Sequence, residues 1–163
     1  MFRKTALALG LLLRSDNAES QKILDLLEQD MVASRFGLTA ADLDRIRHWV
    51  AAVGIRWGLS AEQRQRLGLP AFGQGSWRAG LERLLMGYAM GCDEMIDGIL
   101  PYPDIEGGQA RALGCLCEFL ALVGEAEREL GKAQKLSRWS ELLASYAQRL
   151  LAGDDSDELI ELQ

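Results

Sequence analysis

Apolar residues recur three or four positions apart along most of this chain, which is the spacing of one face of an α-helix. The clearest stripe consists of Leu43, Ile46, Trp49, Val50 and Val53. No alternating segment of convincing strand length is present, and Val, Ile and Thr are sparse beside Leu, Ala, Arg and Glu. Since unbranched side chains lose little rotamer freedom in a helix, the sequence predicts an all-α fold.

Capping and helix-breaking residues divide this pattern into about seven helices. We expect them over residues 3–13, from 20 to a turn at 36–39, over 40–53, from 61, over 77–88, from about 106 past 122, and from 137. Thr39, Ser60 and Ser76 are predicted N-caps, and Gly37 and Gly54 are predicted to end the helices before them. A length of 163 residues suits one compact multi-helix domain spanning 1–163, with an acidic end at 153–163 that is expected to fray.

The net charge of −6 conceals a basic middle and an acidic end. Residues 35–90 hold eight arginines against four acidic residues, whereas residues 91–163 hold fifteen acidic residues against six basic ones. The overall balance argues against a protein that binds nucleic acid with its whole surface. Charge blocks are usually solvated helix faces, and the basic block predicts at most weak, salt-sensitive binding to duplex DNA.

Three cysteines occur, Cys92, Cys115 and Cys117, and their number and spacing do not suit a disulfide framework. This cysteine usage indicates a reducing cytoplasm. The apolar run at residues 6–13 is much shorter than the stretch of about 20 residues that crosses a membrane. Polar residues follow it where a signal peptide would have a cleavage site, so we predict a buried helix and no membrane contact.

The sequence lacks the common motifs that carry chemistry. Its only Gly-Lys pair, Gly131 and Lys132, has neither the upstream glycine nor the following Ser or Thr of a phosphate-binding loop. His48, the only histidine, is predicted to lie off the apolar stripe and to face solvent. Two of the cysteines point apart on one helix, and the carboxylates at 93–97 and 154–158 lack the glycine-centred loop of a calcium site. We therefore predict no catalytic, cofactor-binding or metal-binding residue.

Two further features combine glycine, arginine and aromatic residues. Arg56 and Trp57 lie in a short connection between helices, where Trp57 is expected to fill the core. The alternative is a functional one, in which Arg56 contacts a phosphate or a partner carboxylate. On the helix that begins at Trp77, Gly80 and Gly87 lie two turns apart on one face, where the missing side chains permit close approach of another helix.

Several segments in a fixed order carry a family likeness. They are "GIRWGL" at 54–59, a Leu-Pro pair before a glycine-rich loop, "WRAGLERLLMGYAM" at 77–90 and "LPYPDIEG" at 100–107. The stretch "ILDLLEQDMVASRFGLTAADLDRIRHWV" before them and Trp139 ahead of "ELLASYAQRLL" belong to the same pattern. As an ordered set that covers nearly the whole chain, these segments resemble the RecC (gamma) subunits of exodeoxyribonuclease V.

This resemblance implies a non-catalytic domain of a subunit several times longer than this chain. RecC-like subunits are similar to superfamily 1 helicases that have lost the ATP-binding residues. They assemble with RecB-like and RecD-like subunits into a nuclease that unwinds duplex DNA ends in double-strand-break repair and recombination. The helical order resembles the accessory 2B domain of such helicases, where a helix–Gly–helix element can contact duplex backbone. Residues 35–46 occupy that place, with Gly37 alone where such elements often carry two glycines.

On this resemblance, five arginines are the predicted contacts with DNA or a partner subunit: Arg35, Arg45, Arg47, Arg56 and Arg78. The acidic residues of 91–163 suit docking to a partner, or solvent, rather than phosphate. Two other interpretations remain open. One is a free-standing helical protein–protein interaction module, and the other is a small enzyme that uses His48 or Cys92.

Overall fold

The structure is a computed structural model that describes residues 20–152. Seven helices follow one another within this range: α2 (Ser20–Leu27), α3 (Asp30–Arg35), α4 (Ala40–Ala52), α5 (Ala61–Arg66), α6 (Trp77–Met90), α7 (Gln109–Leu130) and α8 (Leu136–Ala152). The described residues contain no strand, only one isolated antiparallel bridge between Ile96 and Ile99. The all-α prediction is confirmed. The helix expected at 3–13 and the acidic end at 153–163 lie outside the described residues.

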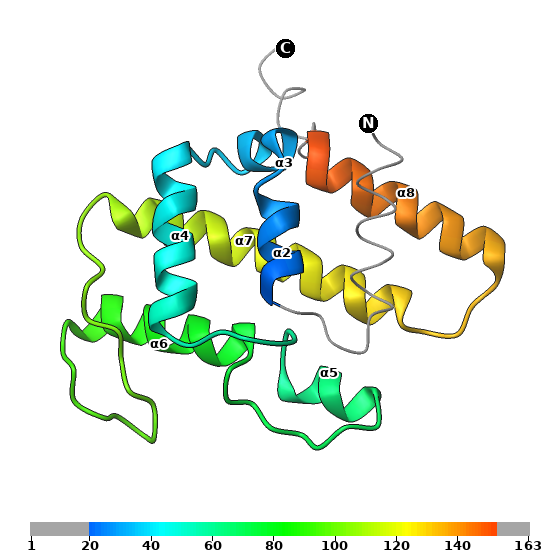
Figure 1. Cartoon of the computed structure of the whole chain (residues 1–163). Coiled ribbons are helices and arrows are strands. Elements are labelled where there is room, and N and C mark those ends of the chain that lie inside the picture. The colour runs from blue at the N-terminus through cyan, green and yellow to red at the C-terminus, as the bar shows by residue number, and fades with distance from the viewer. Residues whose placement is uncertain (1–19, 153–163) are drawn as a thin grey trace, which may run out of the picture.

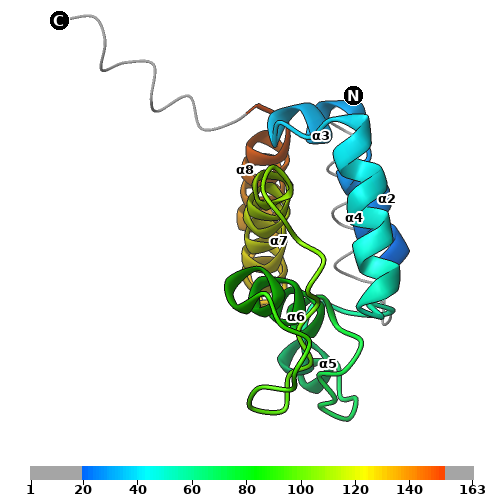
Figure 2. The ribbon, with the colours of Figure 1, turned by 90° about the vertical axis from the view of Figure 1, so that its left-hand side faces the viewer.

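The long helix α7 lies at the centre of the fold. It contacts α4, α6 and α8, and α8 also packs against α3. Figure 1 shows α2 and α4 crossing in front of α7, and the quarter turn in Figure 2 separates these two helices from a layer formed by α7 and α8. The central place of α7 follows from its sequence, because successive turns of one face bury apolar side chains from Leu113 through Phe119 to Leu130.

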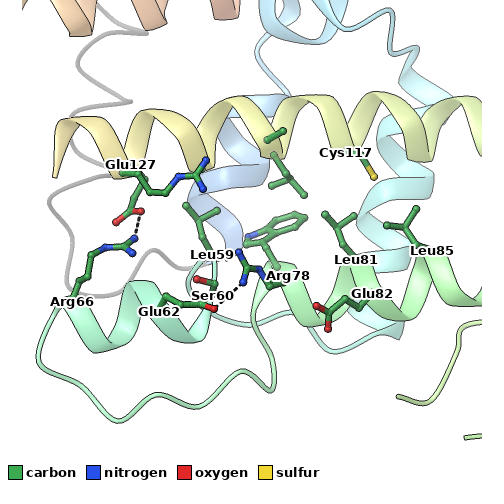
Figure 3. Close-up of a pocket in the computed structure, with 15 residues that line it drawn as sticks. Leu59, Ser60, Glu62, Arg66, Arg78, Leu81, Glu82, Leu85, Cys117 and Glu127 are labelled. Atoms are coloured by element: carbon green, nitrogen blue, oxygen red, sulfur yellow. Dashed lines mark hydrogen bonds and ion pairs between the residues drawn. The ribbon is translucent and has the colours of Figure 1, made fainter. Parts of the chain in front are cut away.

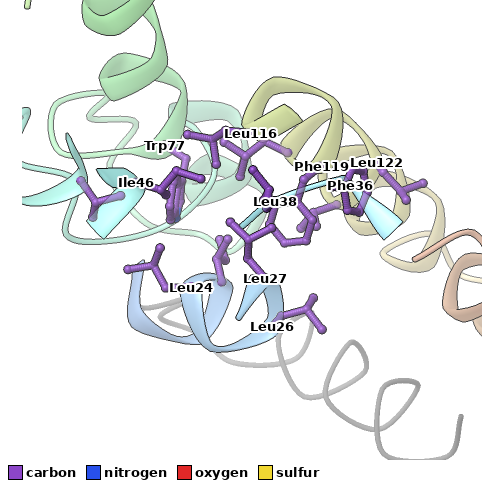
Figure 4. Packing of buried hydrophobic residues seen from close by; sticks show 14 of the residues in the cluster. Leu24, Leu26, Leu27, Phe36, Leu38, Ile46, Trp77, Leu116, Phe119 and Leu122 are labelled. Carbon is purple, nitrogen blue, oxygen red and sulfur yellow. The ribbon is translucent and has the colours of Figure 1, made fainter. Parts of the chain in front are cut away.

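The core lies where the two layers meet. In Figure 4, Leu24 and Leu27 of α2 face Leu116 and Phe119 of α7. The rings of Phe36 and Phe119 meet edge to face, with their centroids 5.5 Å apart. Burial of each such side chain stabilises the fold by roughly 1.5–3 kcal/mol, so this contact between layers is a main source of stability.

The predicted helix boundaries that depend on local chemistry are confirmed. The hydroxyls of Thr39, Ser60 and Ser76 each accept a hydrogen bond from the backbone N–H three residues later. Gly37 and Gly54 follow the ends of α3 and α4 with φ values of +62° and +73°, in the left-handed region where a glycine is unstrained. Local hydrogen bonding therefore determines where these helices begin and end.

The helix expected from residue 20 to the turn at 36–39 is instead two helices, α2 and α3. The chain changes direction at Gln29, whose ψ of 126° is extended. In one straight helix Leu27 and Val32 would point about 140° apart, because successive residues turn by about 100°. The break allows both side chains to be fully buried, which helical periodicity alone does not indicate.

The glycines of α6 permit close packing, as predicted, but connecting segments approach them rather than a helix. A Cβ atom on Gly80 would lie 2.3 Å from the side chain of Ile55. A Cβ atom on Gly87 would lie 1.7 Å from the backbone oxygen of Tyr102. The Tyr102 N–H donates to the backbone oxygen of Arg83 at 2.9 Å, which holds the 91–105 segment against α6.

The connection between α4 and α5 is tight, as predicted, but Trp57 does not fill the core. Its ring is only half-buried, and the guanidinium of Arg64 lies 4.3 Å from the ring centroid. Ile55 is buried in its place. The backbone N–H groups of Arg56 and Trp57 both donate to the oxygen of Gly75, at 2.8 and 3.2 Å, and this pairing orients the connection.

Candidate functional site

A buried carboxylate fixes the turn between α3 and α4, the element expected to contact DNA. Asp42 accepts hydrogen bonds from the N–H and the hydroxyl of Thr39, at 3.0 and 2.7 Å, and from Arg45 at 3.1 Å. It also forms an ion pair with Arg111 of α7, and the same guanidinium donates to the backbone oxygen of Gly37 at 2.6 Å. Arg111 thus ties the turn to the central helix. Sequence reasoning missed it, because nothing near position 111 indicates a partner about 70 positions away.

The charge of Asp42 is stabilised despite its burial. Burial by itself raises the pKa of this carboxyl, but the hydrogen bonds from Thr39 and the Arg111 guanidinium outweigh it and hold the pKa below its ordinary value. Asp42 is therefore ionised at neutral pH and neutralises arginines on the same surface.

The three arginines predicted beside this turn all have acidic partners within the domain. The ion pairs are Arg35 with Glu118 at 3.4 Å, Arg45 with Asp42 at 3.1 Å, and Arg47 with Glu28 at 2.7 Å and with Asp44 at 2.5 Å. The guanidinium of Arg35 also lies over the ring of Phe36, 5.1 Å from its centroid. Together with Arg111, four arginines meet four carboxylates here, so the charges of this set cancel.

The other two predicted arginines lie elsewhere. Arg78, in the first turn of α6, forms an exposed ion pair with Glu62 at 2.8 Å. Arg56, in the connection after α4, is exposed, and its side chain forms no hydrogen bond or ion pair with another described residue. The structure therefore brings Arg35, Arg45 and Arg47 together around one turn and leaves Arg56 and Arg78 outside it.

A groove of about 480 Å³ lies between α5, α6 and α7 (Figure 3). Leu81 and Leu85 of α6 point toward α7, from which Cys117 points back. Charged side chains surround this apolar lining: Arg66 paired with Glu127, Arg78 paired with Glu62, and also Glu82 and Arg128. Sequence reasoning missed the groove, because its lining residues come from three segments that only the tertiary fold brings together.

His48 and the cysteines are the side chains that an enzyme interpretation would use. His48 is exposed, as predicted, and burial raises the pKa of the Cys117 thiol, which makes it a poor nucleophile. All three cysteines are free. In residues 20–152, no three His, Cys, Asp or Glu side chains are grouped to hold a metal ion. No helix in that range is long and apolar enough to span a bilayer.

Comparison with known proteins points to one family. The model of the family described as "RecBCD enzyme subunit RecC fourth domain" matches residues 5–163. The chain is similar to the RecBCD enzyme subunit RecC of Escherichia coli (strain K12), with 38% identity over 74% of this chain and 11% of that subunit. It is also similar to the RecC subunits of Mycobacterium tuberculosis, with 32% identity over 90% of this chain, and of Buchnera aphidicola, with 29% identity over 91%. In these matches the chain spans between 11% and 14% of the length of the curated relatives.

Proposed function

The chain belongs to the RecC family, and from this membership we propose that it is a non-catalytic structural domain that contacts other proteins within a RecBCD-type enzyme. Its partners in this proposal are the rest of a RecC-like subunit and the RecB-like and RecD-like subunits. The assembly is cytoplasmic and processes duplex DNA ends in repair and recombination. The observation that carries the proposal is the cancellation of charge around the α3–α4 turn, where an element expected to contact DNA has arginines paired with acids of the same domain.

Charge cancellation matters because phosphate binding is driven by the release of counterions from DNA to a net positive surface. The exposed ion pairs here are individually weak, at about 0–1 kcal/mol each, so pairing alone does not prevent an arginine from changing partner. A phosphate close to Arg47 would, however, also lie close to Glu28 and Asp44, which repel it. The surface therefore gains little from DNA.

Exposed apolar residues support protein contact instead. Tyr88 and Met90 in the last turn of α6, and Met95 and Leu100 in the loop after it, are between 44% and 69% exposed. We call these four residues the Tyr88–Leu100 surface. Large apolar and aromatic side chains exposed in one region are typical of protein–protein interfaces. We assign this surface to contacts with the partner subunits.

The surroundings of His48 and Cys92, the two residues that an enzyme would use, support the non-catalytic part of the proposal. A general base has to be oriented by a hydrogen bond and placed near its substrate. Among the described residues, His48 has no side-chain hydrogen-bond partner, and Cys92 is half-buried beyond the end of α6. Neither belongs to a nucleophile–base pair with another described residue.

The salt dependence of DNA binding tests the proposal. In the complete complex, replacement of Arg45 and Arg47 by Gln is expected to leave the slope of log affinity for duplex ends against log salt unchanged. If the slope falls by about one for each arginine removed, these side chains contact phosphates and the proposal is wrong. Lys135→Gln with Arg138→Gln, two exposed positions near the start of α8, removes the same charge away from the turn and is the matched control.

Arg56 remains a predicted contact with DNA or a partner subunit, because its guanidinium has no acidic partner among the described residues. The same titration with Arg56→Gln identifies its partner. A slope lower by about one indicates a phosphate, and an unchanged slope with weaker subunit assembly indicates a carboxylate on another protein.

A further inference from the structure

Two glycines of α7, Gly114 and Gly124, have no explanation within the domain, and Gly124 is the one that lines the groove. A Cβ atom on Gly124 would meet no heavy atom within 4 Å, whereas those on Gly80 and Gly87 of α6 would clash. Glycine in a helix interior costs about 1 kcal/mol relative to alanine. Gly124 lines the groove between α5, α6 and α7, on the same side of α7 as Cys117 and Ala121. An element that approaches α7 closely from outside would explain why this position lacks a side chain.

The shape of the groove indicates which kind of element this is. Leu81 and Leu85 are four residues apart on α6, and Cys117, Ala121 and Gly124 are four and three residues apart on α7. Both walls therefore carry side chains at helical spacing, with small residues on one wall, and a third helix can pack between them. Figure 3 shows the leucines of α6 facing Cys117 of α7.

A buried donor beside the groove is also without a partner. Trp77 lines the groove and is 1% exposed, and its Nε1–H has no acceptor among the described residues. An unpaired buried donor costs about 1–3 kcal/mol. The nitrogen is itself buried, so this cost is internal to the domain and is not one that an occupant of the groove removes.

The charges around the groove define the chemistry of the occupant. Arg66 and Arg78 already have acidic partners, and Arg128 interacts electrostatically with Glu125 of the same helix, but Glu82 on α6 forms no ion pair with a described residue. A complementary helix has an apolar face and a basic residue that meets Glu82.

From these features we infer that the groove binds an amphipathic helix from the remaining part of the same RecC-like subunit. The inference rests on the proposed function, and the subunits of the family are long enough to supply this helix, since the chain spans 11–14% of their length. When a linker is short enough and can reach, a helix on the same polypeptide has an effective concentration of about the millimolar range, which favours it over a separate protein.

Thiol labelling of the full-length subunit tests this inference. Ala121→Cys places a thiol in the groove, at a position that is exposed in the domain. Ala41→Cys places one on the exposed side of α4, outside the groove, and is the matched control. N-ethylmaleimide is added to each subunit without its partners, and mass spectrometry of the peptide measures the rate. The Ala121→Cys thiol is expected to react at least about tenfold more slowly than the control, with equal rates after unfolding.

Equal rates in the folded subunit would overturn the inference. Protection that arises only after the RecB-like and RecD-like subunits are added would also overturn it, because a partner protein would then be the occupant. Labelling does not depend on the salt titration of DNA binding, so failure here is distinct from failure of the proposed function.

A charge reversal adds a second test of the occupant. Glu82→Arg in the Ala121→Cys background is expected to speed labelling severalfold, because it repels the basic residue of the bound helix. Glu106→Arg changes the same charge outside the groove and is expected to leave the rate unchanged. If both changes have the same effect, the charge complementarity at Glu82 is wrong.

Discussion

At the scale of the single residue, the carboxylate of Asp42 joins three parts of the fold. It completes the capping box of α4 with Thr39, pairs with Arg45 one turn later, and pairs with Arg111 across the interface with α7. Sequence inspection predicts only part of the first role, the N-cap at Thr39, because threonine is a preferred N-cap residue. It does not predict the third, since the arginine is 69 positions away.

Replacing Asp42 with Asn is expected to destabilise the domain by about 1–3 kcal/mol at pH 7, because charged hydrogen bonds to a buried group are lost. The folded pKa of Asp42 is lowered, so its stabilisation is complete above the unfolded pKa of about 3.9 and disappears as pH falls through the folded pKa. As the pH falls below about 4, the free energy of unfolding should therefore decrease less in the variant than in the wild type, and the difference between the two proteins should shrink. Urea unfolding at pH 7 and pH 3 measures both effects. Asp44→Asn, at a position whose side chain is 74% exposed, is the control, and an equal loss there would contradict this account.

At the scale of elements, the helix starts are predictable and the packing partners are not. Thr39, Ser60 and Ser76 cap helices through bonds to residues three positions away, so local sequence contains the information. The break at Gln29 depends on burial of both α2 and α3 against the rest of the core, which is a tertiary effect. For the same reason the sequence predicts that α6 has a close neighbour at Gly87 but not that the neighbour is a loop.

The fit between α6 and the 91–105 segment makes Gly87 the most sensitive position of this helix. Gly87→Ala is expected to destabilise the domain by about 3 kcal/mol or more, because the new Cβ overlaps backbone atoms of Tyr102 that have little freedom to move. Gly124→Ala is the matched control on α7 and should stabilise the isolated domain by up to about 1 kcal/mol, since a Cβ there meets nothing. Denaturant unfolding of the two variants provides the comparison. Similar effects of both substitutions would mean that α6 and the loop do not pack as described.

At the scale of the whole molecule, folding redistributes the charge that the linear sequence shows. The basic block at 35–90 stands apart in the sequence, but Glu28, Glu118 and Glu127 from the flanking segments pair with its arginines in the fold. Composition therefore predicts the excess of arginine correctly and cannot predict its neutralisation. Family membership and the all-α class could be recognised from ordered motifs and periodicity, whereas the groove between α5, α6 and α7 required the tertiary structure.

The central claim is that this domain contacts other proteins and does not bind duplex DNA through the α3–α4 turn. Hydrogen–deuterium exchange of the RecC-like subunit tests it in three states: alone, assembled with its partners, and assembled with a duplex end. The account predicts that amides of 88–100 gain protection on assembly and that amides of 35–47 do not change when DNA is added. Protection of 35–47 by DNA, with 88–100 unchanged on assembly, would contradict it.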